Sequence, residues 1–325
     1  MKWTRTSTRA KNGRAYTGPE ENHTESKCMR SFIILFHEKT GTSPLVRLLD
    51  KFDLISILHQ VNYTGFEPLD RHRCGRMTLK NLKKCLDIIF TRGPKDIEQL
   101  NRIYMATAQT PLDIIGDEGV VGFKMRFTPP NPYPLHIDRF SVWNRFSERR
   151  FRERYFKSFK KMMFDILRRH NVTVLMAVRQ DVLRLGLSKY HGDGTGKPGH
   201  LQFKVARGAI AKNDIGKIHV DCERLEEIIA DCERVHEEDR HLMEEFTQAG
   251  IQVYPVLYEE FVTDKRRYLE RLFRILELDI TSDELSCVLA EEEYFTKVHS
   301  DDISQFVKNH EEVLSKFSDR YVSWR

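Results

Sequence analysis

The sequence lacks any long hydrophobic run. No apolar stretch approaches the ~20 residues that a membrane-spanning helix needs, and the amino-terminal segment has no apolar signal core. Met1 to Lys27 is polar, carries scattered lysine and arginine, and shows no hydrophobic periodicity. These absences predict a flexible polar tail over residues 1–27, no membrane span, and a cytoplasmic protein.

Paired metal-binding or redox motifs are also missing. The cysteines show no C-x-x-C spacing, which favours reduced thiols over a disulfide framework. They are Cys28, Cys74, Cys85, Cys222, Cys232 and Cys287. His236 and His241 come nearest to a pair of metal ligands, but they stand five residues apart among Glu and Arg, which indicates a solvated helix face. We expect no metal site.

A strong charge of either sign is absent as well. Lys and Arg number 53 against 48 Asp and Glu, for a net charge of +5. Such a mild excess suits anionic ligands but not a nucleic-acid-binding tail. The 40% hydrophobic content supports a core, and no internal repeat is visible. Since α/β folds often form single domains above the usual ~100–200 residues, we expect one domain over residues 28–325.

The stretch from Ser31 to Ser43 organises the chain. An apolar run ends at Phe36, and a turn with a lysine, hydroxyl groups and a glycine leads into an amphipathic segment over 45–52. This order predicts a buried strand, a loop and a helix. Pro44 fits the first helical turn. Unpaired N–H groups at a helix start suit a phosphate or sulfate. The lysine precedes the glycine, so this is not a Walker A loop.

A second candidate anion site follows Val172–Val178, a β-branched run that predicts a buried strand. Arg179 comes directly after it, and Ser188 lies nine residues later, on the expected next helix. A guanidinium and a hydroxyl group both serve phosphate oxygens. Arg184 is an alternative to Arg179 for the main contact.

Strand and helix patterns alternate through most of the chain, which predicts parallel strands joined by helical crossovers, with helices on both faces of the sheet. Ligands of such sheets bind at the carboxyl ends of the strands, so the loops after Phe36 and Val178 can converge. The remaining elements expected are helices over 79–90, around 97–106, from the arginine-rich stretch 149–154 to about 170, over 222–249 and over 268–276, and strands over 120–127 and 251–257.

Lys39-Thr40-Gly41-Thr42-Ser43 after a buried strand resembles the 5′-phosphosulfate loop of sulfotransferases, which use 3′-phosphoadenosine-5′-phosphosulfate (PAPS). Arg179 and Ser188 resemble the pair with which these enzymes clamp the 3′-phosphate. Phe66-Glu67-Pro68-Leu69 resembles a segment beside the acceptor in carbohydrate sulfotransferases. Tyr258-Glu259 and the Lys297–Val313 segment are similar to late structural elements of the family. The resemblance, to carbohydrate and bacterial enzymes more than to cytosolic phenol enzymes, covers about residues 31–313 and implies a nucleoside-kinase-like three-layer sandwich. A Golgi enzyme without its membrane anchor would look the same.

The resemblance implies a role for each matching residue. Lys39 would neutralise charge on the bridging oxygen, Thr40, Gly41, Thr42 and Ser43 would bind the 5′-phosphosulfate, and Arg179 or Arg184 with Ser188 would bind the 3′-phosphate. Glu67 is the first candidate base, since Pro68 keeps it out of a helix, and His37 is the second. No metal is required.

The implied reaction moves a sulfuryl group to a hydroxyl or amine of a small-molecule or carbohydrate acceptor, and a hydroxyl is weakly favoured. An ATP-dependent small-molecule kinase is the alternative enzyme, and a non-catalytic nucleotide-binding protein of the same fold is the third possibility. The sequence indicates neither the acceptor nor the oligomeric state.

Overall fold

The chain folds around one sheet whose strands all run in the same direction. A computed structural model describes residues 30–37, 40–57, 79–91, 119–127, 142–194, 216–290 and 302–320. Within these ranges a five-stranded sheet has the order β2-β3-β1-β4-β5, and every neighbouring pair is parallel. The strands are β1 Ser31–Phe36, β2 Ile55–Ile57, β3 Val120–Met125, β4 Thr173–Val178 and β5 Val253–Leu257. The helices are α1 Thr42–Leu49, α2 Leu79–Thr91, α4 Val142–Arg169, α5 Val182–Gly194, α7 Cys222–Gln248, α8 Tyr258–Thr263, α9 Lys265–Ile275, α10 Ser282–Ala290 and α11 His310–Phe317, with short 3₁₀ turns η3 Ile303–Gln305 and η4 Ser318–Arg320.

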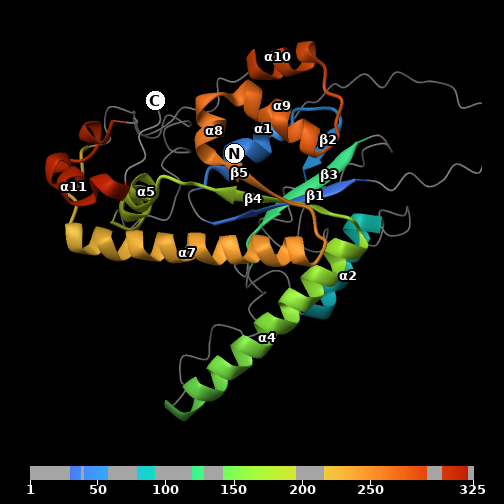
Figure 1. Ribbon diagram of the computed structural model, residues 1–325, viewed down its shortest axis with the longest axis horizontal. Coiled ribbons are helices and arrows are strands. Elements are labelled where there is room, and N and C mark those ends of the chain that lie inside the picture. The colour runs from blue at the N-terminus through green and yellow to red at the C-terminus, as the bar shows by residue number, and fades with distance from the viewer. Residues whose placement is uncertain are drawn as a thin grey trace, which may run out of the picture.

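Helices cover both faces of the sheet. In Figure 1, α1, α8, α9 and α10 lie on one side, and α2, α4 and α7 lie on the other. In β1, Phe32 and Ile34 belong to the cluster that contains α1 and α9, whereas Ile33 and Leu35 belong to the cluster that contains α2 and α4. Because both faces are buried, the strand is apolar throughout rather than alternating. The expected three-layer α/β architecture is confirmed.

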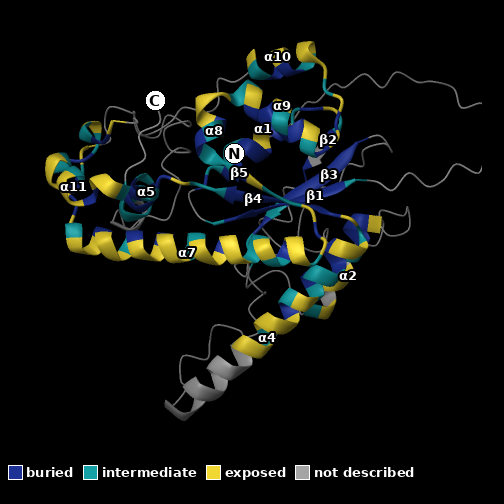
Figure 2. Ribbon diagram, in the orientation of Figure 1, coloured by how far each residue is buried: buried dark blue, intermediate teal, exposed yellow. Residues whose placement is uncertain are grey.

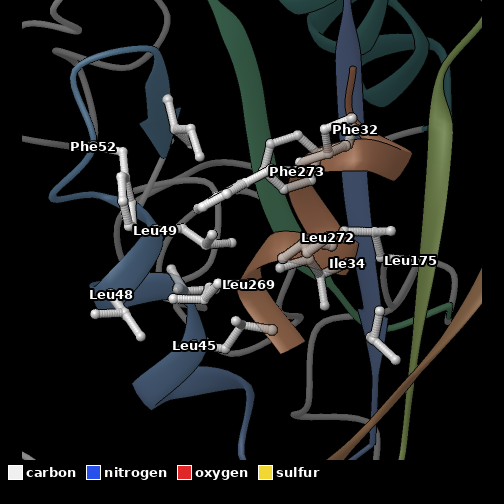
Figure 3. Packing of buried hydrophobic residues seen from close by; sticks show 14 of the residues in the cluster. Phe32, Ile34, Leu45, Leu48, Leu49, Phe52, Leu175, Leu269, Leu272 and Phe273 are labelled. Atoms are coloured by element: carbon white, nitrogen blue, oxygen red, sulfur yellow. The ribbon is translucent and has the colours of Figure 1, made fainter. Parts of the chain in front are cut away.

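The packing of α1 fixes the start of that helix relative to β1. Its buried leucines recur at the spacing of one helical face and meet the apolar face of α9 (Figure 3). Phe52, which follows α1, packs edge-to-face on Phe273, with ring centroids 4.9 Å apart. The loop between β1 and α1 therefore joins a fully buried strand to a helix whose apolar face is buried. The labelled residues of this cluster are Phe32, Ile34, Leu45, Leu48, Leu49, Phe52, Leu175, Leu269, Leu272 and Phe273.

A third apolar cluster joins α5, α7 and the C-terminal segment. It contains Leu183, Leu187, Val220, Leu225, Ile229, Ile303, Val307, Val313 and Phe317. Asn309 forms two hydrogen bonds with Val220, which precedes α7. Its Oδ1 accepts from the Val220 N–H and its Nδ2 donates to the Val220 carbonyl, both at 2.9 Å. Residues 302–317 thus support α5, the helix that carries Ser188.

Most of the expected boundaries are confirmed, including β1, α2, β4, α7 and the stop of α7 before Gly250. α1 ends at Leu49 rather than at Phe52. The helix expected around 97–106 lies outside the described residues.

α4 is longer than expected, because the arginine-rich stretch 149–154 lies inside the helix and not at its start. Arg, Glu and Lys have good helix propensity even without an apolar face, and Glu153 and Arg154 are exposed. The outer side of α7 is likewise exposed along its length (Figure 2). Neither α4 nor α7, nor any other helix in the described ranges, combines the length and apolar character needed to cross a membrane.

Candidate anion-binding site

The two candidate loops follow neighbouring strands at the point where the connections diverge. From β1 the chain moves out to β2 and back to β3, and then crosses to β4 on the other side of β1. Phe36 pairs with Ala177 in the β1–β4 register, so the two strands end at the same edge. Crevices at such a switch point are the usual ligand sites of open parallel sheets.

The loop after β1 leaves the start of α1 without a side-chain cap. Gly41 is the N-cap residue with φ 73° and makes no capping hydrogen bond. Thr40 turns inward, because its Oγ1 donates to the His37 carbonyl at 2.8 Å, and both Thr40 and Thr42 are buried. The first N–H groups of α1 can therefore serve an anion. Lys39 lies outside the described residues.

Lys124 of β3 adds a cation to this loop. Its Nζ donates to Ser43 Oγ at 2.8 Å and lies 4.9 Å from the centroid of the Phe36 ring. Lys124 was not among the site residues predicted from the sequence. The sequence does contain a signal for it: Lys124 is the one charged residue of an otherwise apolar strand, next to the end of that strand.

Tyr258 contacts both loops, which brings the two predicted anion sites together. The Arg179 guanidinium carbon lies 4.6 Å from the centroid of its ring. A Cβ atom at Gly41 would lie only 2.3 Å from Cδ2 of the same ring, so the ring rests against the glycine. Tyr258 starts α8, directly after β5. The loops after β1 and β4 thus share one aromatic wall, although Tyr258 was expected to be only structural.

Two buried carboxylates shape the loop after β4. Asp181 caps α5 by accepting from the Arg184 N–H at 2.9 Å, and its Oδ2 lies 3.3 Å from Arg184 Nε. Glu259 accepts from the Asp181 N–H at 3.0 Å. Burial raises the pKa of the Asp181 carboxyl above its ordinary value, against the opposing effects of Arg184 and Arg179. Arg184 is therefore held by an acidic partner at the start of its own helix.

Ser188 stands one helical turn after Arg184 on α5 and is half-buried. Residues four apart lie on the same side of a helix. Leu183 and Leu187 instead face the third apolar cluster. The structure thus places Ser188 on the Arg184 side of α5.

His37 forms a pair with a residue of α7, a contact that was not predicted from the sequence. Its Nε2 lies 2.8 Å from Asp239 Oδ1. His236, one turn before Asp239, is half-buried, so its assignment to a solvated face was wrong. For His241 the assignment is confirmed, because 61% of its side chain is exposed beside Glu237. Among the described residues, no group of His, Cys, Asp and Glu is arranged to hold a metal ion.

The sequence of α7 contains a pattern from which the involvement of Asp239 could have been predicted. Its inward stripe has the spacing of one helical face, and two polar residues interrupt it. The stripe runs Leu225, Ile229, Cys232, His236, Asp239, Met243, Phe246. A buried aspartate and a half-buried histidine in an otherwise apolar stripe indicate a function for that part of the helix.

Replacing His236 with glutamine is expected to make the stability less sensitive to acid. Burial lowers the pKa of His236 in the folded protein, despite the opposing charge of Asp239. The unfolded chain therefore binds this proton more readily, so the free energy of unfolding falls as the pH drops below the ordinary imidazole value of about 6.5. Urea unfolding between about pH 7.5 and pH 5.5 measures this slope. His241→Gln, at an exposed position of the same helix, is the control, and equal slopes in wild type and His236→Gln would contradict the assignment.

Glu67, the first candidate base, also lies outside the described residues. The structure consequently places His37, Thr40, Gly41, Thr42, Ser43 and Arg179 at one edge of the sheet, and Ser188 on the adjoining helix. It gives no position for Lys39 or Glu67.

Comparisons with known proteins find a match among solved structures alone. A scan against protein-family models finds no match, and a search of curated protein sequences finds none either. Among solved structures, the chain is similar to the sulfotransferase STF9 from Mycobacterium avium at 12% sequence identity, over 90% of this chain and 76% of that one, with a TM-score of 0.34.

Proposed function

We propose that the protein is a PAPS-dependent sulfotransferase formed by a single domain over residues 28–325, preceded by a polar tail. The observation that carries the proposal is the contact of Tyr258 with both Gly41 and Arg179. Two candidate anion-binding loops at one switch point, both in contact with one aromatic ring, match a nucleotide with phosphate groups on both its 3′ and its 5′ oxygen. The free thiols of Cys222, Cys232 and Cys287 favour a reducing compartment such as the cytoplasm.

The loop after β1 binds the 5′-phosphosulfate in this proposal. The N–H groups of Thr42 and Ser43 and the hydroxyl groups of the loop surround the anion, and Lys39 neutralises the charge that grows on the bridging oxygen. Lys124, already bonded to Ser43, adds a second positive charge. Donors held in place before the reaction act where charge develops in the transition state.

The loop after β4 binds the 3′-phosphate. Arg184 shares its charge with Asp181, whereas Arg179 stacks on the Tyr258 ring, which orients its guanidinium. We therefore assign the main contact to Arg179, with Ser188 as the hydroxyl partner. The acceptor is the hydroxyl or amine of a small molecule or carbohydrate, and either Glu67 or His37 takes its proton.

Two measurements test the proposal against its alternatives. In a thermal-shift comparison, adenosine 3′,5′-bisphosphate at ~100 times its Kd should add about 2.7 kcal/mol of stability. A larger shift with ATP and Mg²⁺ would favour the kinase alternative. A screen of metabolite extracts for an added SO₃ group, with PAPS supplied, then identifies the acceptor. Binding without any such product would favour the non-catalytic nucleotide-binding protein.

Arg179→Ala is expected to weaken the binding of adenosine 3′,5′-bisphosphate about 10- to 100-fold, the scale of hydrogen bonds to a charged group. Binding of adenosine 5′-phosphosulfate, which lacks the 3′-phosphate, should hardly change. Isothermal titration with both ligands measures the difference. Arg224→Ala is the matched control, since Arg224 stacks on Tyr190 at 5.4 Å in a similar contact between α7 and α5. If Arg184→Ala lost the discrimination and Arg179→Ala kept it, the assignment would be reversed.

A further inference from the structure

The pair of His37 and Asp239 joins the first anion loop to the far side of the fold. His37 directly follows β1, and Asp239 lies 202 residues later on α7, with Nε2 and Oδ1 2.8 Å apart. Phe36 points toward α1, so the alternation of the strand directs His37 toward the layer that contains α7. We propose that His37 is the base that deprotonates the acceptor and that Asp239 is the residue that positions it. This inference rests on the proposed sulfuryl transfer.

In this pair the histidine is partly exposed and the aspartate is buried, which is the arrangement that a general base requires. The side chain of His37 is 41% exposed, whereas that of Asp239 is 9% exposed. The imidazole is thus open to a bound acceptor, and the carboxylate behind it is shielded from water, where its interaction with a positive charge is strongest.

A second histidine–aspartate pair in the same chain shows the opposite arrangement. His170 Nε2 lies 3.0 Å from Asp87 Oδ1, but here the histidine side chain is 12% exposed and the aspartate is 31% exposed. Asp87 is also shared with Arg169. This pair lies before β4 begins, at the sheet edge opposite the two loops. In this pair the histidine is the less exposed partner, and the contact ties α2 to the end of α4, away from both loops.

The contact with Asp239 decides which ring nitrogen reacts. In the neutral imidazole, one nitrogen carries the proton and the other a lone pair. With Nε2–H donating to the carboxylate, the lone pair is on Nδ1. A third group that orients a base in this way is the general pattern of activated proton acceptors.

The charges around the pair permit His37 to become positive. His236 of α7 interacts electrostatically with both members of the pair, and Glu259 of α8 and Lys189 of α5 also act on His236. Burial keeps His236 neutral near pH 7, so it does not repel an imidazolium at His37. The Asp239 carboxylate stabilises that imidazolium directly.

The reaction step balances with these groups alone. As the acceptor oxygen or nitrogen attacks sulfur, its proton moves to Nδ1 of His37. The bond between sulfur and the bridging phosphate oxygen breaks, and adenosine 3′,5′-bisphosphate leaves with the electron pair. The proton on His37 is then released to water.

The test compares Asp239→Asn with Asp87→Asn, which removes the carboxylate of the other pair. With ³⁵S-labelled PAPS and a metabolite extract as the source of acceptor, Asp239→Asn should lower the apparent kcat about 100-fold, within the range of general-base catalysis, and change the KM for PAPS less than about twofold. Asp87→Asn should leave both values unchanged. In a His37→Ala background, Asp239→Asn should cause no further loss, because the two residues act as a unit.

A readout without turnover accompanies the kinetics. Nitrogen-15 NMR of the His37 ring, assigned by its loss in His37→Ala, should show the proton on Nε2 in wild type and a mixture of tautomers in Asp239→Asn. A proton on Nδ1 in wild type, equal turnover of the two aspartate variants, or a full loss from Asp239→Asn in the His37→Ala background would overturn the inference. So would loss of turnover in Glu67→Gln with normal turnover in Asp239→Asn. A wild type that neither binds adenosine 3′,5′-bisphosphate nor consumes PAPS would instead refute the proposed function itself.

Discussion

Gly41→Ala should lower the free energy of unfolding by about 2–5 kcal/mol, the sum of a left-handed backbone penalty and an overpacking penalty. Gly41 has φ +73°, and its added Cβ would lie 2.3 Å from the ring of Tyr258. Any shift of the ring would also disturb its contact with the Arg179 guanidinium, which lies 4.6 Å from the ring centroid. The variant should therefore also bind adenosine 3′,5′-bisphosphate poorly, since one displacement disturbs both loops.

Gly250→Ala provides a control that isolates the clash. Gly250 has nearly the same backbone conformation, φ +74°, but nothing lies within 4 Å of its Cβ position. Urea unfolding of both variants measures the backbone penalty in Gly250→Ala and the backbone penalty plus the clash in Gly41→Ala. The double variant Gly41→Ala, Tyr258→Ala should recover the clash component. Equal destabilisation by the two glycine substitutions would show that Tyr258 does not press on the loop.

Lys39→Ala should lower turnover by about 10²–10³, the scale of one preorganised group that stabilises transition-state charge. The lysine would act mainly on the bridging oxygen, whose charge grows only as the sulfur–oxygen bond breaks. Binding of adenosine 3′,5′-bisphosphate should therefore weaken much less than kcat falls. Initial rates with labelled PAPS and thermal shifts with the product separate the two effects.

Two comparisons make the Lys39 result specific. Lys39→Arg keeps the charge but not the compact ammonium group, so it should restore only part of the rate. Lys308→Ala removes an exposed lysine from the C-terminal segment and should have no effect. Near-normal turnover in Lys39→Ala would remove the role assigned to this residue, and the cation at the loop would then have to be Lys124.

The elements predicted correctly are those whose local sequence contains the reason for their structure. β1 and β4 are short apolar runs bounded by polar residues, and burial on both faces makes them apolar throughout. The anion loops could be placed at one sheet edge because parallel strands end together. Gly41 and Arg179 could be predicted as site residues because each lies within a few residues of the apolar run that predicts its strand.

The rest of the site depends on contacts between distant segments. Asp239 lies among charged residues of α7, and only the fold brings it to His37. Tyr258 was expected to be structural because its neighbours in sequence form a strand and a helix. Its contacts with Gly41 and Arg179 involve the loops after β1 and β4, which are distant in sequence. The start of α4 was missed because Arg and Glu favour a helix without producing an apolar period.

The position of Tyr258 has a consequence for protein synthesis. The ribosome releases β1 and its loop early, but Tyr258 follows β5, the last strand in the part of the chain that the structure describes. Until β5 emerges, β4 has one open edge, and its apolar residues lack part of their cover. Pairing between strands so far apart in sequence is slow, because the entropy of loop closure is lost before the stabilising contacts form. The nascent chain therefore exposes this apolar strand edge from the emergence of β4 until the emergence of β5. Chaperones that hold apolar segments would protect the edge during that interval.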